Sequence, residues 1–336
     1  MTDGVPAGWI RDGDKYALMA LSVKVEGPLP LHEFAPSLSV LGDTAFTVPS
    51  HWREWLGTIR VEEIEACNLF LLSTQASRKP DILDEEHQLL DRRVWHFYVG
   101  LLLASRFAPA HKPVMLSGAC IDGEIGVRSQ KDFDVPTPCM FRFYPSLLPE
   151  EIEAAAQLGT NIEAIVQAAL PGGHWRLFRT LTLYTHARTI PDPLERTHQY
   201  CRCIDGLILP DAGKTAKQFK SRTELFMGPG HHEFMGELYD VRSAVEHLHE
   251  NRYLEVYNRT TRLDLIKKEA IAEYVARSTL TRIIGNQSLW PHFGNTAALA
   301  QFWKLPEPER RALWGNPIDP LHAIAEFDPK YIPDDV

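Results

Sequence analysis

The spacing of hydrophobic residues divides the chain into a first part that mixes strands with one helix and a second part that is helical throughout. Between 84 and 107 apolar residues recur at helical spacing, after an acidic start that suits a helix N-terminus. Elsewhere in the first part they form short runs typical of strands. The predicted strands cover 16–25, 68–74, 113–117 and 123–128, with one more after a loop at 132–139.

After Pro149 the hydrophobic pattern becomes helical to the end of the chain. The clearest start signal is Asp192-Pro-Leu-Glu195, with Asp as the N-cap, Pro at the first helical position and Glu three residues after the cap. This helix carries its apolar stripe on Leu194, Cys201, Ile204, Leu207 and Ile208. The predicted helices cover 150–170, 174–188, 192–208, 214–227, 233–250 and 264–284, with two short ones at 296–303 and 307–314.

These patterns predict two domains. The break falls between Pro145 and Pro171, and we place it after residue 147. An α+β domain at 1–147 is then followed by an all-α helical bundle at 148–330.

Composition and charge disfavour several classes of protein. The 336 residues carry a net charge of −9, which disfavours a protein that coats nucleic acid by bulk electrostatics. The charge is uneven, since 214–282 holds twelve Lys and Arg against ten Asp and Glu, a net charge of +2 that leaves −11 for the rest. No apolar run is long enough to cross a bilayer, and the first residues do not form a signal sequence. We therefore expect a cytoplasmic protein without a membrane partner.

Five cysteines without a CxxC pair do not predict a disulfide framework or a zinc ribbon. Cys201-Arg-Cys203 could bind a metal or act in redox chemistry. The simpler interpretation is that both are small apolar residues buried in a helix, because unlinked cysteines are usually buried and inert. We expect no metal site and no cofactor.

The predicted helix at 233–250 places two chemically capable side chains, Arg242 and His247, outside its hydrophobic stripe. We expect that stripe to consist of Phe234, Leu238, Val241, Val245 and Leu248. On a straight helix Arg242 and His247 point about 140° apart, while His249 points close to the direction of Arg242. A plainer interpretation pairs Arg242 with Glu246, four residues on, and lets His247 flank the core.

The segment Tyr239-Asp-Val-Arg242-Ser243…His247 resembles the Arg-x4–6-His helix of HEPN domains. Asp205, in Tyr200-Cys-Arg-Cys-Ile-Asp205, stands where that family has an acidic residue in an apolar helix, and Phe219-Lys-Ser-Arg222 resembles the helix that follows. The resemblance covers about 192–285 and is closest to the ApeA-like branch, in which a C-terminal HEPN domain follows a different N-terminal region.

This resemblance implies a metal-independent endoribonuclease that cleaves single-stranded RNA, with Arg242 and His247 as the catalytic residues of a homodimer. A histidine can move the protons of the reaction, and a guanidinium can stabilise charge on the phosphate. Ser243, Glu246, His249, Asp205 and Tyr239 are then expected to support the site or to bind RNA. A toxin or phage-defence effector is the implied role, with 1–147 of unassigned role and sensing a trigger as one hypothesis for it.

Two alternatives remain open at this point. One is a non-catalytic HEPN module that binds RNA, a nucleotide or a partner protein. The other is a dimeric scaffold with no ligand, in which Arg242 and His247 are occluded.

Overall fold

The computed structural model describes residues 8–27, 29, 32–35, 37–137, 146–169, 172–325, 327 and 329–335, without the side chains of 35 and 331. The chain forms two compact units. The first consists of 1–136 and 144–163, and the second of 137–143 and 164–336. The longer segment of the second unit begins at Ala164, inside helix α4 (Pro149–Ala168).

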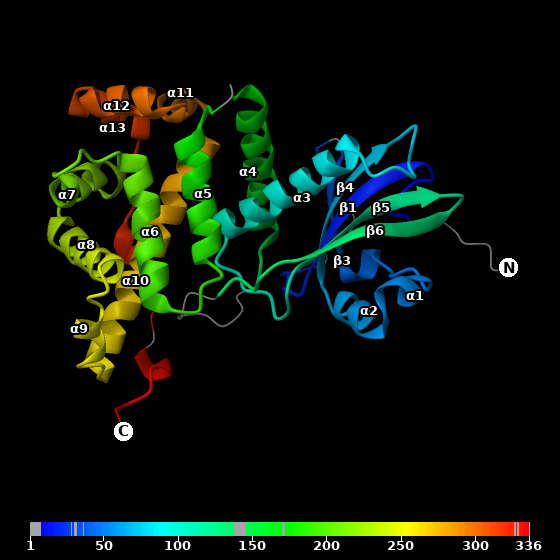
Figure 1. Ribbon diagram of the computed structural model, residues 1–336, viewed down its shortest axis with the longest axis horizontal. Coiled ribbons are helices and arrows are strands. Elements are labelled where there is room, and N and C mark those ends of the chain that lie inside the picture. The colour runs from blue at the N-terminus through cyan, green and yellow to red at the C-terminus, as the bar shows by residue number, and fades with distance from the viewer. Residues whose placement is uncertain are drawn as a thin grey trace. The chain divides into compact units, whose positions relative to one another are not determined.

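The first unit is built on a six-stranded antiparallel sheet (Figure 1) with the order β2-β3-β4-β1-β5-β6. The four strands predicted between 16 and 128 are β1, β4, β5 and β6. The short strands β2 and β3 were not predicted, and the strand expected after 139 lies outside the described residues. The strands are β1 (Asp14–Leu21), β2 (His32–Ala35), β3 (Leu38–Gly42), β4 (Leu69–Ala76), β5 (Val114–Ile121) and β6 (Glu124–Asp132).

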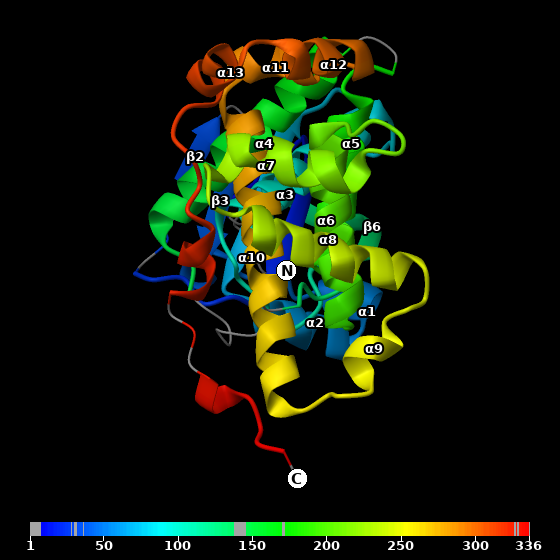
Figure 2. The ribbon, with the colours of Figure 1, turned by 90° about the vertical axis from the view of Figure 1, so that its left-hand side faces the viewer.

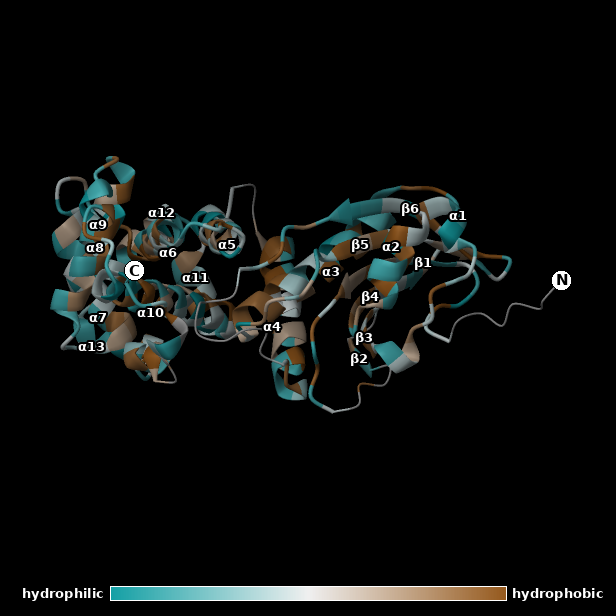
Figure 3. Cartoon of the chain, turned by 90° about the horizontal axis from the view of Figure 1, so that it is seen from below, coloured by the Kyte–Doolittle hydropathy of each residue, from teal (hydrophilic) through white to brown (hydrophobic). Residues whose placement is uncertain are grey.

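Helices cover both faces of the sheet. Tyr16 and Leu18 of β1 share a hydrophobic core with Trp52 and Ile64, from the side of α1 (Trp52–Leu56) and α2 (Thr58–Glu65). Because side chains alternate along a strand, Met19 faces the other way, where α3 (Glu85–Ala104) packs on β1, β4 and β5. Burial on both faces explains why β1 reads as an almost continuous apolar run after Lys15, and Figure 3 shows brown, hydrophobic segments within the sheet.

Within the first unit, α3 and α4 approach each other closely at two glycines. A Cβ atom on Gly100 would lie 2.1 Å from the carbonyl oxygen of Ala155, and one on Gly159 would lie 2.9 Å from the amide nitrogen of Phe97. Neither position has room for a side chain, so these glycines set the spacing of the two helices.

The second unit is helical (Figure 2), and the mixed first part and helical second part are confirmed. Helix α10 packs against α5, α6 and α7, while α11, α12 and α13 lie together at one end. The helices are α5 (Trp175–Ala187), α6 (Pro193–Ile208), α7 (Thr215–Met227), α8 (His232–Glu246), α9 (Asn251–Leu254), α10 (Arg259–Gly285), α11 (Trp290–Phe293), α12 (Thr296–Lys304) and α13 (Glu307–Trp314). Short 3-10 turns are η1 (Asp43–Ala45), η2 (Gln287–Leu289), η3 (Pro320–Ile324) and η4 (Pro329–Tyr331). Among the described residues, no helix combines the length and apolar character that a membrane span requires.

Helix α6 follows its sequence signals closely. The Asp192 carboxylate accepts a hydrogen bond from the amide of Glu195 at 2.8 Å, and Pro193 opens the helix as predicted. All five residues of its predicted stripe are buried. Cys201 and Cys203 are fully buried, and burial raises the pKa of both thiols. The two thiols are therefore buried apolar groups, as the simpler interpretation held.

A buried ionic network joins α5, α6 and α10. Arg196 of α6 donates to the carboxylate of Glu269 at 2.6 Å, and both side chains are only 2% exposed. One turn along α10, the Glu273 carboxylate accepts hydrogen bonds from Tyr184 and Arg277, each at 2.9 Å. Burial raises the pKa of Glu269, while the hydrogen bond from Arg196 opposes that shift. These contacts link residues 73 and 89 positions apart in the chain.

Candidate functional site

Helix α8 packs on α6 and α7 through a face that differs from the predicted stripe. Its buried residues are Met235, Leu238, Val241 and Ala244. Phe234 is half-buried and Val245 packs, partly buried, against the core cluster around Val241, but Leu248 is 80% exposed, so the prediction was wrong at Leu248. Leu248 was included in the predicted stripe because the helix was expected to continue to residue 250, whereas α8 ends at Glu246.

Arg242 and Asp205 face each other between α8 and α6. The Arg242 Nε atom lies 3.5 Å from Asp205 Oδ2, and the side chains are 20% and 14% exposed. This distance makes an ion pair but not a hydrogen bond, and Asp205 Oδ1 also lacks a hydrogen-bond partner among the described residues. Two half-buried charged groups thus keep donor and acceptor capacity that the fold does not use.

The environment of Asp205 disfavours its charged form. Burial raises the pKa of Asp205 to about 6, and nearby Glu246 adds to the shift, whereas Arg242, Arg202 and His198 oppose it. Because the ordinary value is 3.8, the folded protein binds a proton at Asp205 more tightly than the unfolded chain does. Stability should therefore fall as the pH rises from about 4 to about 6.

Replacing Asp205 with Asn should stabilise the protein at neutral pH, because Asn cannot ionise. The free energy of unfolding should rise by up to ~3 kcal/mol at pH 7.5, and the gain should vanish near pH 4. Urea unfolding at the two pH values measures the difference. Glu246→Gln is the matched control and should lower the free energy of unfolding at neutral pH. The hydrogen bond from His198 lowers the pKa of Glu246, so the fold favours its ionised form. Equal destabilisation by Asp205→Asn at both pH values would contradict this account.

His198 belongs to the same face and was not predicted. Its Nε2 atom lies 2.7 Å from Glu246 Oε2, its Nδ1 atom lies 3.4 Å from Glu195 Oε1, and the ring is buried. Glu246 therefore pairs with His198 of α6; among the described contacts it makes no ion pair with Arg242, although the charge of Arg242 helps to lower its pKa. The spacing of the residues could have indicated His198, because it stands seven residues before Asp205 and therefore on the same face of α6.

The C-terminal end of α8 sets the positions of His247 and His249. His247 is the C-cap, and Leu248 adopts a left-handed conformation with φ of 56°. The amide of His249 then donates to the carbonyl of Ala244 at 2.7 Å, which closes a Schellman motif. His249 has therefore left the helix, and the prediction that it points along Arg242 on a continuous helix was wrong. Both rings are exposed, with centroids 6.3 Å apart.

Tyr239 and Ser243, the remaining predicted residues, lie beside Arg242 on α8. The Arg242 guanidinium carbon lies 5.6 Å from the centre of the Tyr239 ring, which in turn packs on Phe219 of α7. Ser243 is half-buried, and its carbonyl accepts the amide of His247 at 3.2 Å. Tyr239 thus helps to position the Arg242 guanidinium through a cation–π contact.

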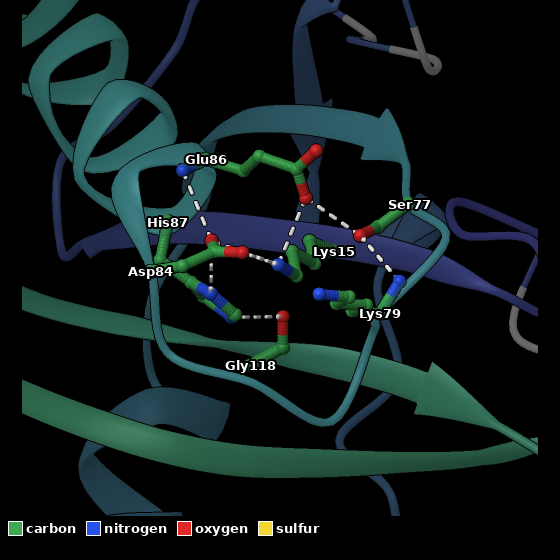
Figure 4. A network of polar contacts seen from close by, with 7 residues as sticks. All are labelled: Lys15, Ser77, Lys79, Asp84, Glu86, His87 and Gly118. Carbon is green, nitrogen blue, oxygen red and sulfur yellow. Dashed lines mark hydrogen bonds and ion pairs between the residues drawn. The ribbon is translucent and has the colours of Figure 1, made fainter.

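A second polar cluster lies in the first unit, around Lys15 (Figure 4). The fully buried Lys15 ammonium of β1 lies 2.8 Å from carboxylate oxygens of both Asp84 and Glu86. Burial lowers the pKa of Lys15, but these two hydrogen bonds outweigh it and raise the pKa above its ordinary value. Asp84 also caps α3, and His87 lies 3.2 Å from the carbonyl of Gly118. The cluster fastens the start of α3 to the sheet, with one buried ammonium shared between two carboxylates.

Comparison of the chain with protein-family models, with curated proteins and with solved structures finds no match. The site has to be judged from its own chemistry.

The α6–α8 face combines groups that could act on a phosphodiester. Arg242 offers a held but incompletely bonded guanidinium, and His247 and His249 offer exposed imidazoles at the end of the same helix. Asp205 carries a carboxylate whose pKa lies close to neutrality. A perturbed acid paired with a fixed cation is typical of functional sites.

Proposed function

We propose that the chain is a HEPN-type endoribonuclease, in which Arg242 and His247 cleave single-stranded RNA without a metal ion. The observation that carries the proposal is the position and bonding of the Arg242 guanidinium. It is positioned by Asp205 and Tyr239, yet its Nε atom makes no hydrogen bond among the described residues. Because this Nε atom is buried against Asp205, the 20% exposed side chain would bind a phosphate through its terminal guanidinium nitrogens.

In the proposed reaction, the two residues divide the chemistry. His247 removes the proton from the ribose 2′-hydroxyl or protonates the departing 5′-oxygen. Arg242 stabilises the negative charge that builds up on the phosphate oxygens. The bond between phosphorus and the 5′-oxygen breaks as the 2′-oxygen attacks, which leaves a 2′,3′-cyclic phosphate and a 5′-hydroxyl.

The proposed active form is a homodimer. Arg242 lies within α8, whereas His247 lies at its C-cap and is exposed, so the two side chains leave the helix in different directions. Two copies of the α8 end, facing each other, would bring both residue types to one phosphate. Leu248, which is 80% exposed beside His247, is apolar surface that a second copy would cover.

Replacing Arg242 with Ala should lower the rate of RNA cleavage by about 10²–10³-fold, because a preorganised donor to the phosphate is lost. The assay uses purified protein and single-stranded RNA of mixed sequence in excess chelator. Arg252→Ala is the matched control, since the exposed side chain of this α9 arginine makes polar contacts with the carbonyl of Asp240 and with the ring and hydroxyl of neighbouring Tyr253. An equimolar mixture of Arg242→Ala and His247→Ala should regain measurable cleavage if the site is shared by two chains.

The alternative is a non-catalytic module that binds RNA, a nucleotide or a partner protein. One observation favours it: Arg242 already has Asp205 and Tyr239 as neighbours and could serve to hold α6 and α8 together. That alternative predicts RNA binding without cleavage, with an affinity that His247→Ala leaves unchanged. An inert protein of this kind would overturn the ribonuclease proposal.

A further inference from the structure

A cleft in the second unit, distinct from the α6–α8 face, carries an excess of positive charge. It lies between α7, the end of α12 and α13, and has a volume of about 540 Å³. Neither Arg242 nor His247 lines it. Its lining holds five cations and the two carboxylates Glu224 and Glu307, a net charge of +3. The five cations are Lys214, Lys217, Arg222, Arg310 and Arg311.

Two of these cations are fixed by the ends of neighbouring helices. Arg222 donates to the carbonyls of Ile208 and Leu209 at the end of α6, and Arg310 donates to the carbonyls of Trp303 and Leu305 at the end of α12. Both guanidinium groups also contact the indole of Trp303, with their carbon atoms 5.4 and 5.8 Å from its centre. Two like charges are therefore held on one aromatic ring, an arrangement that costs free energy unless an anion joins them.

The surrounding acids compensate this charge only in part. Arg311 pairs with Glu307 at 2.7 Å, and Glu224 pairs with His232 at 3.0 Å. Asp211, just outside the lining, lies 3.9 Å from both Lys214 and Arg222, too far for a hydrogen bond. Burial lowers the pKa of Arg222, the Asp211 carboxylate opposes that shift, and the charge of Arg310 lowers the pKa further.

Lys217 has no ion-pair partner among the described residues, and its side chain is exposed beside these groups. Arg310 uses one of its terminal nitrogens for the two carbonyls, which leaves donors on the same group for a ligand. The cleft thus combines fixed guanidinium donors with exposed ammonium groups.

We infer that this cleft binds a small molecule through two or three adjacent phosphate groups. The volume is that of a small-molecule site, and guanidinium and ammonium groups are the usual partners of phosphate oxygens. Trp303 is buried under two guanidinium groups and offers no free face for stacking a base. The site therefore recognises the phosphates and not the base, whether they come from a nucleotide or from free polyphosphate. Binding there does not depend on RNA cleavage at Arg242 and His247.

Calorimetry on the full chain tests this inference with sodium tripolyphosphate as the probe. Tripolyphosphate should bind, ATP and GTP should bind with equal affinity, and AMP should bind at least about tenfold more weakly because it has one phosphate. Lys217→Ala and Arg311→Ala should each weaken tripolyphosphate binding about tenfold. Neither residue caps a helix, so both variants should fold, which thermal unfolding checks.

Lys220→Ala is the matched control, because Lys220 lies on the same helix but outside the cleft. It should leave the affinity for tripolyphosphate nearly unchanged. Equal weakening by Lys217→Ala and Lys220→Ala would show that only overall charge matters and would overturn the inference. The absence of tripolyphosphate binding, or a strong preference between ATP and GTP, would overturn it too. So would a single-stranded oligonucleotide that binds in a Lys217-dependent manner while tripolyphosphate does not.

Discussion

Replacing His247 with Ala should lower the rate of RNA cleavage by about 10²–10⁴-fold, which is the usual contribution of a general acid or base. The residue is the exposed C-cap of α8, and its imidazole has no hydrogen bond among the described residues. Its loss should therefore change the free energy of unfolding by less than about 0.5 kcal/mol. Initial rates on single-stranded RNA in chelator, together with urea unfolding, separate an effect on catalysis from an effect on folding.

Two variants on the same segment provide controls for His247→Ala. His232 stands at the opposite end of α8, is exposed and pairs with Glu224 at 3.0 Å, so His232→Ala should cleave RNA like the wild type. His249→Ala should reduce the rate less than His247→Ala, because His249 lies beyond the helix end. If His247→Ala and His232→Ala have equal rates, His247 has no role in proton transfer.

Replacing Glu269 with Ala should destabilise the protein by about 3–5 kcal/mol, because it leaves the buried Arg196 charge without its partner. Both side chains are 2% exposed, so bulk solvent does not screen the charge that is left. Urea unfolding at neutral pH measures the change. The loss should appear in the whole helical unit, since Arg196 ties α6 to α10 and also donates to the carbonyls of Ile190 and Pro191.

An ion pair with an exposed carboxylate, on the same helix, gives the matched control for Glu269→Ala. Asp264 pairs with Lys268 at 2.6 Å, but it is half-exposed and Lys268 keeps a second partner in Glu237. Asp264→Ala should therefore cost less than about 1 kcal/mol. The double variant Arg196→Met with Glu269→Leu should recover much of the stability that Glu269→Ala loses. A cost for Glu269→Ala no larger than that for Asp264→Ala would contradict the assigned role of the pair.

The sequence predicted elements whose signals are local. The cap and the apolar stripe of α6 were readable because Asp192, Pro193 and Glu195 stand together and the stripe has a regular period. The C-terminal residue of α8 could not be predicted from the sequence in the same way. A left-handed C-terminal residue is usually Gly or Asn, and here it is Leu248, so the helical pattern was extended to residue 250. Strands β2 and β3 were missed because they are only four and five residues long.

The residues of the candidate site were predicted only where they belong to a local motif. Arg242, Asp205 and His247 were found from short motifs, and the structure brings Arg242 and Asp205 together. The pairing of Glu246 with His198 joins residues 48 positions apart, which no local pattern reveals. Buried charges such as Lys15 and Arg196 were also hidden, since hydropathy alone places charged residues at the surface.

The most direct test of the proposed ribonuclease site is the chemistry of the RNA ends that the wild-type protein leaves. Single-stranded RNA is incubated with the protein in excess chelator, and the products are analysed by mass spectrometry. Cleavage by Arg242 and His247 predicts 2′,3′-cyclic phosphate and 5′-hydroxyl ends, absent when both residues are replaced by Ala. Intact RNA, or 3′-hydroxyl and 5′-phosphate ends that appear only when a divalent metal is added, would contradict it.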